Sequence, residues 1–284
     1  MRSIGNKMSY IYAHKVKDTI RILSDTKPTI ANNDLLKLEK RFTKEEYCNF
    51  IKYGFIKTVI YKSDLTISSA GDVEHFNEYL RFLYKNDIDD IKIIINEAFN
   101  FCFKYNGDTD FIITTEKDIY EVTERGVKNV PFSWIGDEDA NIEFNKFKEN
   151  NVPDEIYYIG EASEEIRKLD KERNLIDKAF ESLINNKKIN TVGGFVVRCI
   201  YEEKYKFLVP YISTSEKPQI LESGKGLIFD STKEDGGFTF MPLESSQYYC
   251  GYFKQIDKYI IYRSGYKDEK YKYISMPYIV DNIN

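Results

Sequence analysis

Four short apolar runs near the start of the chain predict two pairs of strands. Residues 9–13 and 19–23 are joined by the polar stretch 14–18, which is typical of a hairpin. Residues 55–61 and 64–69 predict the second pair. Small residues directly after the last run end the strand pattern.

Helical spacing of apolar residues begins near residue 72 and predicts a helix with one buried face. That face comprises Val73, Phe76, Tyr79, Leu80 and Leu83. The lysine-rich stretch 31–53 predicts a helix and a loop. Further helices are predicted at 88–104, 136–150 and 163–186, the last two opening on acidic residues that suit a helix N-terminus.

Strands return at 111–115, 118–122, 193–202 and 204–212. Strands and helices thus occur in runs rather than in strict alternation, which indicates a layered α+β fold. Residues 213–284 differ, because turn clusters separate short aromatic-rich strands there and no helix is predicted. We expect this tail to be a β-rich C-terminal extension.

The composition is that of an ordinary globular chain of 284 residues, 42% hydrophobic and 31% charged. Its formal net charge of −5 disfavours nucleic acid and anionic membranes as partners. No apolar run is long enough to span a membrane, and the first residues lack the apolar core of a signal peptide. We therefore expect a cytoplasmic protein without a nucleic-acid or membrane partner.

Histidine is scarce, since the chain holds only His14 and His75. This excludes a metal site of several histidines and leaves a Ser-His-Asp or Cys-His mechanism two candidates for its base. We expect both histidines at the surface. No cofactor, zinc site or disulfide framework is predicted, because the cysteines are far apart and form no CxxC pair; they are Cys48, Cys102, Cys199 and Cys250.

Residues 9–29 resemble the opening of proteasome β-subunits and of the bacterial proteasome-like heat-shock protease. In that family a nucleophile starts the first strand, and a hairpin leads to a conserved aspartate and threonine. Aligned without a gap, Ser9 matches the nucleophile, Asp25 the aspartate and Thr29 the threonine.

Later segments extend the resemblance in the same order. Residues 57–83 resemble the second block of the family, with Lys57 at the catalytic lysine and Gly71 at the turn that supplies an oxyanion donor. Residues 132–140 resemble a later glycine-containing stretch, and 191–194 resemble the double glycine before a late strand. The four blocks together favour the family more than any one of them.

The resemblance implies the four-layer αββα sandwich of the N-terminal-nucleophile (Ntn) hydrolases over residues 9–212. Residues 1–8 would then be an N-terminal extension or propeptide, and 213–284 the β-rich C-terminal extension. Ring assembly from copies of the chain is implied as well.

The resemblance also implies a mechanism. The α-amine of the nucleophile acts as its own base, and a reference pKa of about 7.7–8.0 suits that task. Lys57 would lower the proton affinity of Ser9, and Asp25 would hold the ammonium of Lys57. The backbone N–H of Gly71 would meet the developing oxyanion. Histidine has no role in such a mechanism, so its scarcity is no obstacle.

Two departures concern the nucleophile. An α-amine base requires Ser9 to be the first residue, yet Met8 and seven further residues precede it. Self-processing members of the family have glycine directly before the nucleophile, where this chain has Met8. Translation that starts at Met8, followed by removal of the methionine, would expose the amine. The nucleophile is serine where the family has threonine.

A third departure concerns the polar residues around the double glycine. Active proteasome β-subunits have Asp and Ser just before the double glycine. They also have Ser directly after the glycine of the earlier glycine-containing stretch. Here Asp137 follows the matching Gly136. The positions before the double glycine hold Ile189 and Val192, with Asn190 and Thr191 as the only polar substitutes.

Two functions stay open. The first is an amidohydrolase that cleaves peptide or amide bonds through an acyl-enzyme on Ser9. The second is a catalytically inactive proteasome-like scaffold that binds a protein partner, because each of the four site residues also suits a turn, cap or strand position. Tyrosines in the tail would fit such an interaction surface; they are Tyr248, Tyr249, Tyr252, Tyr259 and Tyr262.

Overall fold

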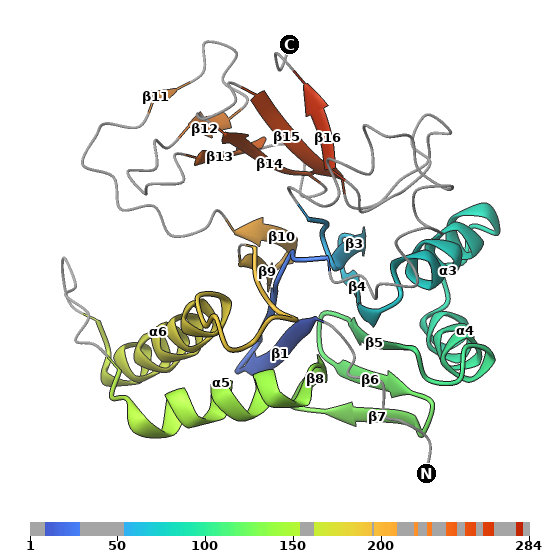
Figure 1. Ribbon diagram of the computed structural model, residues 1–284, viewed down its shortest axis with the longest axis horizontal. Helices are drawn as coiled ribbons and strands as arrows, with labels where there is room; N and C mark the ends of the chain where they lie inside the picture. The colour runs from blue at the N-terminus through green and yellow to red at the C-terminus, as the bar shows by residue number, and fades with distance from the viewer. Residues whose placement is uncertain are drawn as a thin grey trace.

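The strands assemble into three antiparallel sheets in the computed structural model of the chain (Figure 1). The structure describes residues 9–28, 54–153, 162–194 and 196–208, together with short strands between 219 and 280. The predicted helix and loop at 31–53, Thr29 and the segment 1–8 lie outside the described residues.

The first sheet contains the predicted N-terminal hairpin. Its strand order is β10-β9-β2-β1-β8, and its members are β1 (Tyr10–Val16), β2 (Thr19–Ser24), β8 (Phe132–Gly136), β9 (Val197–Glu202) and β10 (Lys204–Leu208). The hairpin turn is confined to residues 17 and 18, so the strands run longer than their apolar cores indicated.

The second sheet has the strand order β3-β4-β5-β6-β7. Its members are β3 (Thr58–Lys62), β4 (Leu65–Gly71), β5 (Thr109–Thr114), β6 (Ile119–Thr123) and β7 (Gly126–Val130). Strands β7 and β8 were not predicted. Both are edge strands, and the three central residues of β7 are exposed, so neither shows a continuous apolar run.

Two pairs of helices complete this part of the chain (Figure 1). They are α3 (Val73–Lys85), α4 (Ile91–Lys104), α5 (Glu138–Asn150) and α6 (Glu164–Ile184). Each begins after a side chain that accepts hydrogen bonds from backbone N–H groups of its first turn; these N-caps are Asp72, Asp90, Asp137 and Ser163. All four helices were predicted from the sequence.

Three apolar clusters hold these elements together. One joins the facing sides of the two five-stranded sheets and includes Ile11, Ile22 and Ile112. A second packs α3 and α4 on the second sheet. The third packs α5 and α6 on the first sheet around Tyr10 and Phe180. Both faces of the first sheet are therefore buried.

The third sheet lies in the C-terminal part of the chain and is a meander in the order β11-β12-β13-β14-β15-β16. Its strands are β11 (Gln219–Ile220), β12 (Gly226–Ile228), β13 (Gly237–Pro242), β14 (Tyr248–Phe253), β15 (Lys258–Arg263) and β16 (Pro277–Val280). In the described ranges, no helix is long and apolar enough to cross a membrane.

Candidate active site

Asp25 and Lys57 form an ion pair that is completely buried. Asp25 follows the last residue of β2, and Lys57 directly precedes β3, so the pair ties one sheet to the other. The Lys57 Nζ donates to Asp25 Oδ1 at 2.6 Å and to the carbonyl oxygen of Lys27 at 2.9 Å. The structure thus brings together two of the four residues that the resemblance singled out.

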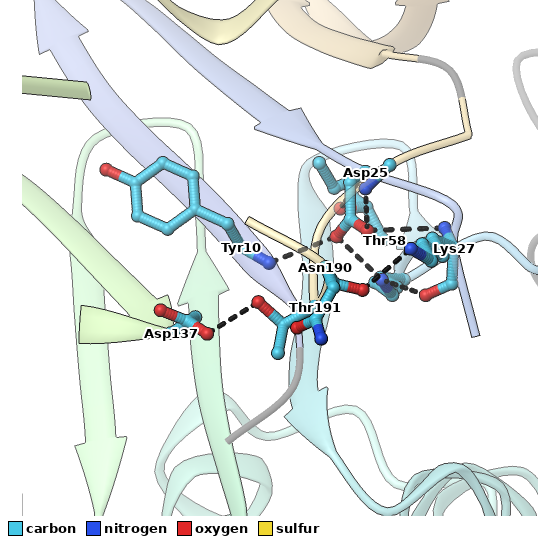
Figure 2. A network of polar contacts seen from close by, with 10 residues as sticks. Tyr10, Asp25, Lys27, Thr58, Asp137, Asn190 and Thr191 are labelled. Atoms are coloured by element: carbon cyan, nitrogen blue, oxygen red, sulfur yellow. Dashed lines mark hydrogen bonds and ion pairs between the residues drawn. The ribbon is translucent and has the colours of Figure 1, made fainter. Parts of the chain in front are cut away.

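Backbone N–H groups surround the rest of the Asp25 carboxylate (Figure 2). Oδ1 also accepts from the amide of Tyr10 at 3.0 Å. Oδ2 accepts from the amides of Lys27 at 3.2 Å and Gly193 at 3.3 Å. Four donors, one each from Tyr10, Lys27, Lys57 and Gly193, thereby fix the position of the carboxylate.

The electrostatic state of Lys57 reflects two opposing effects. Its burial lowers its pKa, because a low-dielectric interior disfavours the charged form. The charge and the hydrogen bond of Asp25 raise the pKa of Lys57 and offset part of that effect, whereas the charge of Lys27 lowers it further. An ammonium held in this way is a strong local positive charge, since little water screens it.

Ser9 lies at the junction of this pair with the first sheet. It directly precedes β1, is 2% exposed and has a φ of +145°, a left-handed region that a serine rarely adopts. The amide of Tyr10, which follows Ser9, shares Asp25 Oδ1 with the Lys57 ammonium. The backbone of Ser9 is therefore next to the ion pair.

Gly71 ends β4, two residues after Ser69, whose amide donates to the carbonyl oxygen of Lys57 at 2.9 Å. Its φ of +125° and its approach to the chain require glycine, because a Cβ would lie 2.0 Å from the carbonyl oxygen of Asp108. Asp72 then caps α3. Gly71 is joined to the Lys57 backbone through β4, and its role as an oxyanion donor stays a prediction.

Asp137 and Thr191 also belong to the site, although the sequence indicated them only as departures from the family. The amide of Asp137 donates to the carbonyl oxygen of Ser9 at 2.8 Å. Asp137 Oδ2 accepts from Thr191 Oγ1 at 2.5 Å, and Oδ1 accepts from the amide of Ala140 at 2.9 Å (Figure 2). The sequence indicated acidic residues at the start of the helix that is now α5, but it did not indicate the contact between Asp137 and Thr191.

The segment around the double glycine closes over the pair. The carbonyl oxygen of Gly193 accepts from the amides of Thr26 and Lys27, at 3.2 and 3.1 Å. The carbonyl oxygen of Asn190 accepts from Lys27 Nζ at 2.6 Å (Figure 2). These contacts bring residues before β9 against the loop that carries Asp25.

The prediction that both histidines lie at the surface was wrong for His14. Its side chain is on the helix-covered face of β1, where the residue is 4% exposed. Burial and the cations of Arg21, Lys148 and Arg173 lower its pKa to about 3. His75 is partly buried, stacks on Tyr105 with ring centroids 3.6 Å apart, and contacts Thr109.

The described part of the chain holds two buried thiols and no cluster of metal ligands. No three His, Cys, Asp or Glu side chains there could hold a metal ion together. Cys102 and Cys199 are buried, as expected for core residues, and burial raises the pKa of the Cys199 thiol. Cys48 and Cys250 lie outside the residues whose side chains are described.

Comparisons with known proteins find likenesses among solved structures. No family model matches the chain, and no curated protein matches its sequence. Among solved structures, the chain is similar to the crystal structure of eukaryotic HslV from Trypanosoma brucei, with 14% identity and a TM-score of 0.42. The alignment covers 68% of this chain and 99% of that one.

Proposed function

We propose that the chain is an N-terminal-nucleophile amidohydrolase of the proteasome type, which cleaves peptide or amide bonds through an acyl-enzyme on Ser9. The observation that carries the proposal is the fully buried Lys57–Asp25 pair, which shares its carboxylate oxygen with the amide that follows Ser9. A buried ion pair is costly to desolvate and adds little net stability. Its place beside a serine at a strand start favours a catalytic role.

The first half of the reaction forms the acyl-enzyme. Ser9 Oγ attacks the carbonyl carbon of the substrate amide while the free α-amine of Ser9 accepts the hydroxyl proton. The Lys57 ammonium stabilises the negative charge that develops on Oγ, and the backbone N–H of Gly71 donates to the oxyanion. The C–N bond then breaks, and the proton on the α-amine passes to the leaving amine.

The second half returns the enzyme to its starting state. The α-amine removes a proton from water, and the resulting hydroxide attacks the ester carbon. The C–O bond to Ser9 breaks, the carboxylic acid leaves, and Oγ takes the proton back. Atoms and charges balance without a cofactor or a metal.

The fold supports the same proposal at a coarser level. Two antiparallel sheets face each other and each is covered on its outer side by two helices, which is the order expected of an αββα sandwich. We extend the proposal to residues 9–212 as the hydrolase domain, to residues 213–284 as its extension, and to a cytoplasmic homo-oligomer acting on peptides.

Intact mass and substitutions at Ser9, with a control on α6, test the proposal. The natively expressed protein should have the mass of a chain that begins at Ser9. Ser9→Ala should abolish hydrolysis of broad peptide substrates, Ser9→Thr should retain it, and the exposed Ser182→Ala on α6 should leave it unchanged. A mature chain that keeps its first eight residues would overturn the α-amine mechanism and leave the inactive scaffold as the better interpretation.

A further inference from the structure

Several buried polar atoms on the helix-covered side of the first sheet have no hydrogen-bond partner among the described residues. They are both ring nitrogens of His14, Nη1 of Arg21, Nε of Arg173 and Oδ1 of Asn174. His14 and Arg21 are only 4% and 5% exposed. A buried polar group without a partner costs free energy, and a bound ion or water molecule is a common explanation.

Strand register and one ion pair bring these atoms together beneath α6, which with α5 covers this face of the sheet (Figure 1). His14 on β1 is directly opposite Arg21 on β2. Arg21 Nη2 donates to both carboxylate oxygens of Asp177 on α6, at 3.2 and 3.0 Å. Arg173 and Asn174 precede Asp177 by four and three residues, so the three lie on the same face of α6.

Helix α5 adds another cation to this group. Lys148 Nζ is 5.6 Å from the ring centroid of Tyr12, and that ring is 5.4 Å from the ring of His14. Burial, followed by the charges of Arg21, Lys148 and Arg173, lowers the pKa of His14 to about 3. His14 is therefore neutral near pH 7, with one ring nitrogen that donates and one that accepts.

Acidic side chains of α6 also face the group, but they bind other atoms of its cations. Asp177 accepts from Arg21 Nη2, and Asp170 accepts from Arg173 Nη1 at 3.3 Å. Glu172 is exposed, and its charge acts on the lysine of α5. One nitrogen of each guanidinium is left without an acceptor. Charged donors favour an anionic acceptor over a neutral one.

We propose that these atoms form a binding site for inorganic phosphate between α5, α6 and the first sheet. The two arginine nitrogens donate to phosphate oxygens, and so does the N–H of His14. Phosphate also keeps an O–H group near pH 7, which the second ring nitrogen of His14 or Oδ1 of Asn174 accepts. The partly exposed side chains of Lys148 and Arg173 form the solvent side of the site and move to admit the ion.

Three anions test this assignment on the full chain. Calorimetric titration near pH 7 at constant ionic strength measures the affinity for phosphate, for sulfate, which has no O–H, and for phosphoserine, whose phosphate has largely lost its O–H. Phosphate should bind, and the other two should bind about tenfold more weakly. In protein labelled with ¹⁵N-histidine, phosphate should shift the ring nitrogens of His14 and not those of His75. His14→Phe assigns the signals.

Two substitutions at the solvent side test the cations without emptying the core. Arg173→Gln and Lys148→Met should each weaken phosphate binding about tenfold, because each removes a charged donor. Arg125→Gln on the exposed turn between β6 and β7 and Lys146→Met on α5 make the same changes elsewhere. Both controls should bind phosphate as the wild type does. Circular dichroism shows that each variant is folded.

Each result bears on the inference independently of hydrolysis. Ring nitrogens of His14 that phosphate does not shift overturn it, and so do variants at Arg173 and Lys148 that bind phosphate like their controls. Sulfate or phosphoserine that binds as tightly as phosphate overturns the assignment to inorganic phosphate. The site needs neither a free α-amine nor a reaction at Ser9, so failure of the proposed function leaves this inference standing.

Discussion

The Asp25–Lys57 pair predicts a large effect on stability at the scale of single residues. Lys57→Met would leave the Asp25 carboxylate buried without its cation, and Asp25→Asn would leave the ammonium without its anion. Each change should lower the free energy of unfolding by about 3–5 kcal/mol. Urea denaturation, monitored by circular dichroism, measures this loss of stability.

An exposed ion pair provides the control for that prediction. Lys146 and Glu143 form a pair one turn apart on the surface of α5, with the two side chains 58% and 40% exposed. Lys146→Met should leave the denaturation midpoint almost unchanged, because surface pairs contribute little. A midpoint for Lys57→Met as close to the wild type as that of Lys146→Met would contradict the account of a buried, interdependent pair.

His14 predicts how stability depends on pH. Its pKa is about 3 in the folded chain and about 6.5 when unfolded, so the unfolded state binds the proton first as pH falls. Stability should therefore decrease as pH falls from about 6.5 toward 3, by at most about 1.4 kcal/mol per pH unit. The charged groups that face it are Arg21, Lys148 and Arg173, and all three strengthen the effect.

His14→Phe isolates this contribution, because phenylalanine fills a similar volume and does not titrate. Thermal or urea unfolding of the two proteins at pH 7 and at pH 5 gives the comparison. The wild type should lose more stability than the variant over that interval. Parallel losses in the two proteins would show that His14 is not the group that titrates.

Single residues also show what could not be predicted from sequence. Asp25 and Lys57 were predicted as partners from the resemblance, and they are in contact. The burial of His14 was missed because strand alternation indicates one buried face, whereas both faces of the first sheet are covered. The bond between Asp137 and Thr191 joins residues far apart in the chain, which a local pattern does not reveal.

At the scale of elements, the junction of β8 with β1 depends on one glycine. Gly136 has a φ of +111°, and a Cβ there would meet the carbonyl oxygen of Ser9 at 2.0 Å. Gly136→Ala should force the end of β8 away from Ser9, lower stability and abolish the proposed hydrolysis. Denaturation and an activity assay at a temperature where the variant is folded measure the two effects separately.

Gly126 supplies a matched control for the backbone conformation. Its φ of +133° is equally unfavourable for alanine, but a Cβ there would meet nothing within 4 Å. Gly126→Ala should cost only the conformational strain, about 1–2 kcal/mol, and should leave the proposed hydrolysis unchanged. Equal costs for the two variants would show that the contact with Ser9 does not constrain the site.

Elements with their own local signal were predicted best. The four described helices have a polar cap followed by apolar residues at helical spacing, and both features are local in sequence. Strands β7 and β8 have neither a long apolar run nor a clean alternation, since they are stabilised by pairing with β6 and β1. Pairing depends on distant segments, so these strands emerged only from the structure.

At the scale of the whole molecule, the site is assembled from the ends of several strands. Asp25 follows β2, Lys57 precedes β3, Asp137 follows β8 and Gly193 precedes β9, and all of them contact one another or the start of β1. No single segment contains the site. The relative placement of these strand ends depends on how the two five-stranded sheets pack face to face. The sequence alone indicated this packing only through the order of the four segments that resemble the family.

The separate pairing of the C-terminal strands leads to the last prediction. Among the described strands, β11 to β16 pair only with one another and with no strand of the two five-stranded sheets. A chain that ends at residue 212 should therefore keep every ladder around Ser9 and unfold cooperatively, at a midpoint close to that of the full chain. Circular dichroism and urea denaturation of the two chains measure this.

A second truncation tests whether the ladders are the reason. A chain that ends at residue 196 loses β9 and β10. It thereby loses the pairing of β2 with β9, in which Ile22 lies opposite Cys199 and both belong to the core between the sheets. That chain should not fold, because it exposes an open edge and part of the core between the sheets. If the chain ending at residue 212 also fails to fold, the C-terminal strands must cover part of that core themselves, and the division at residue 212 is wrong.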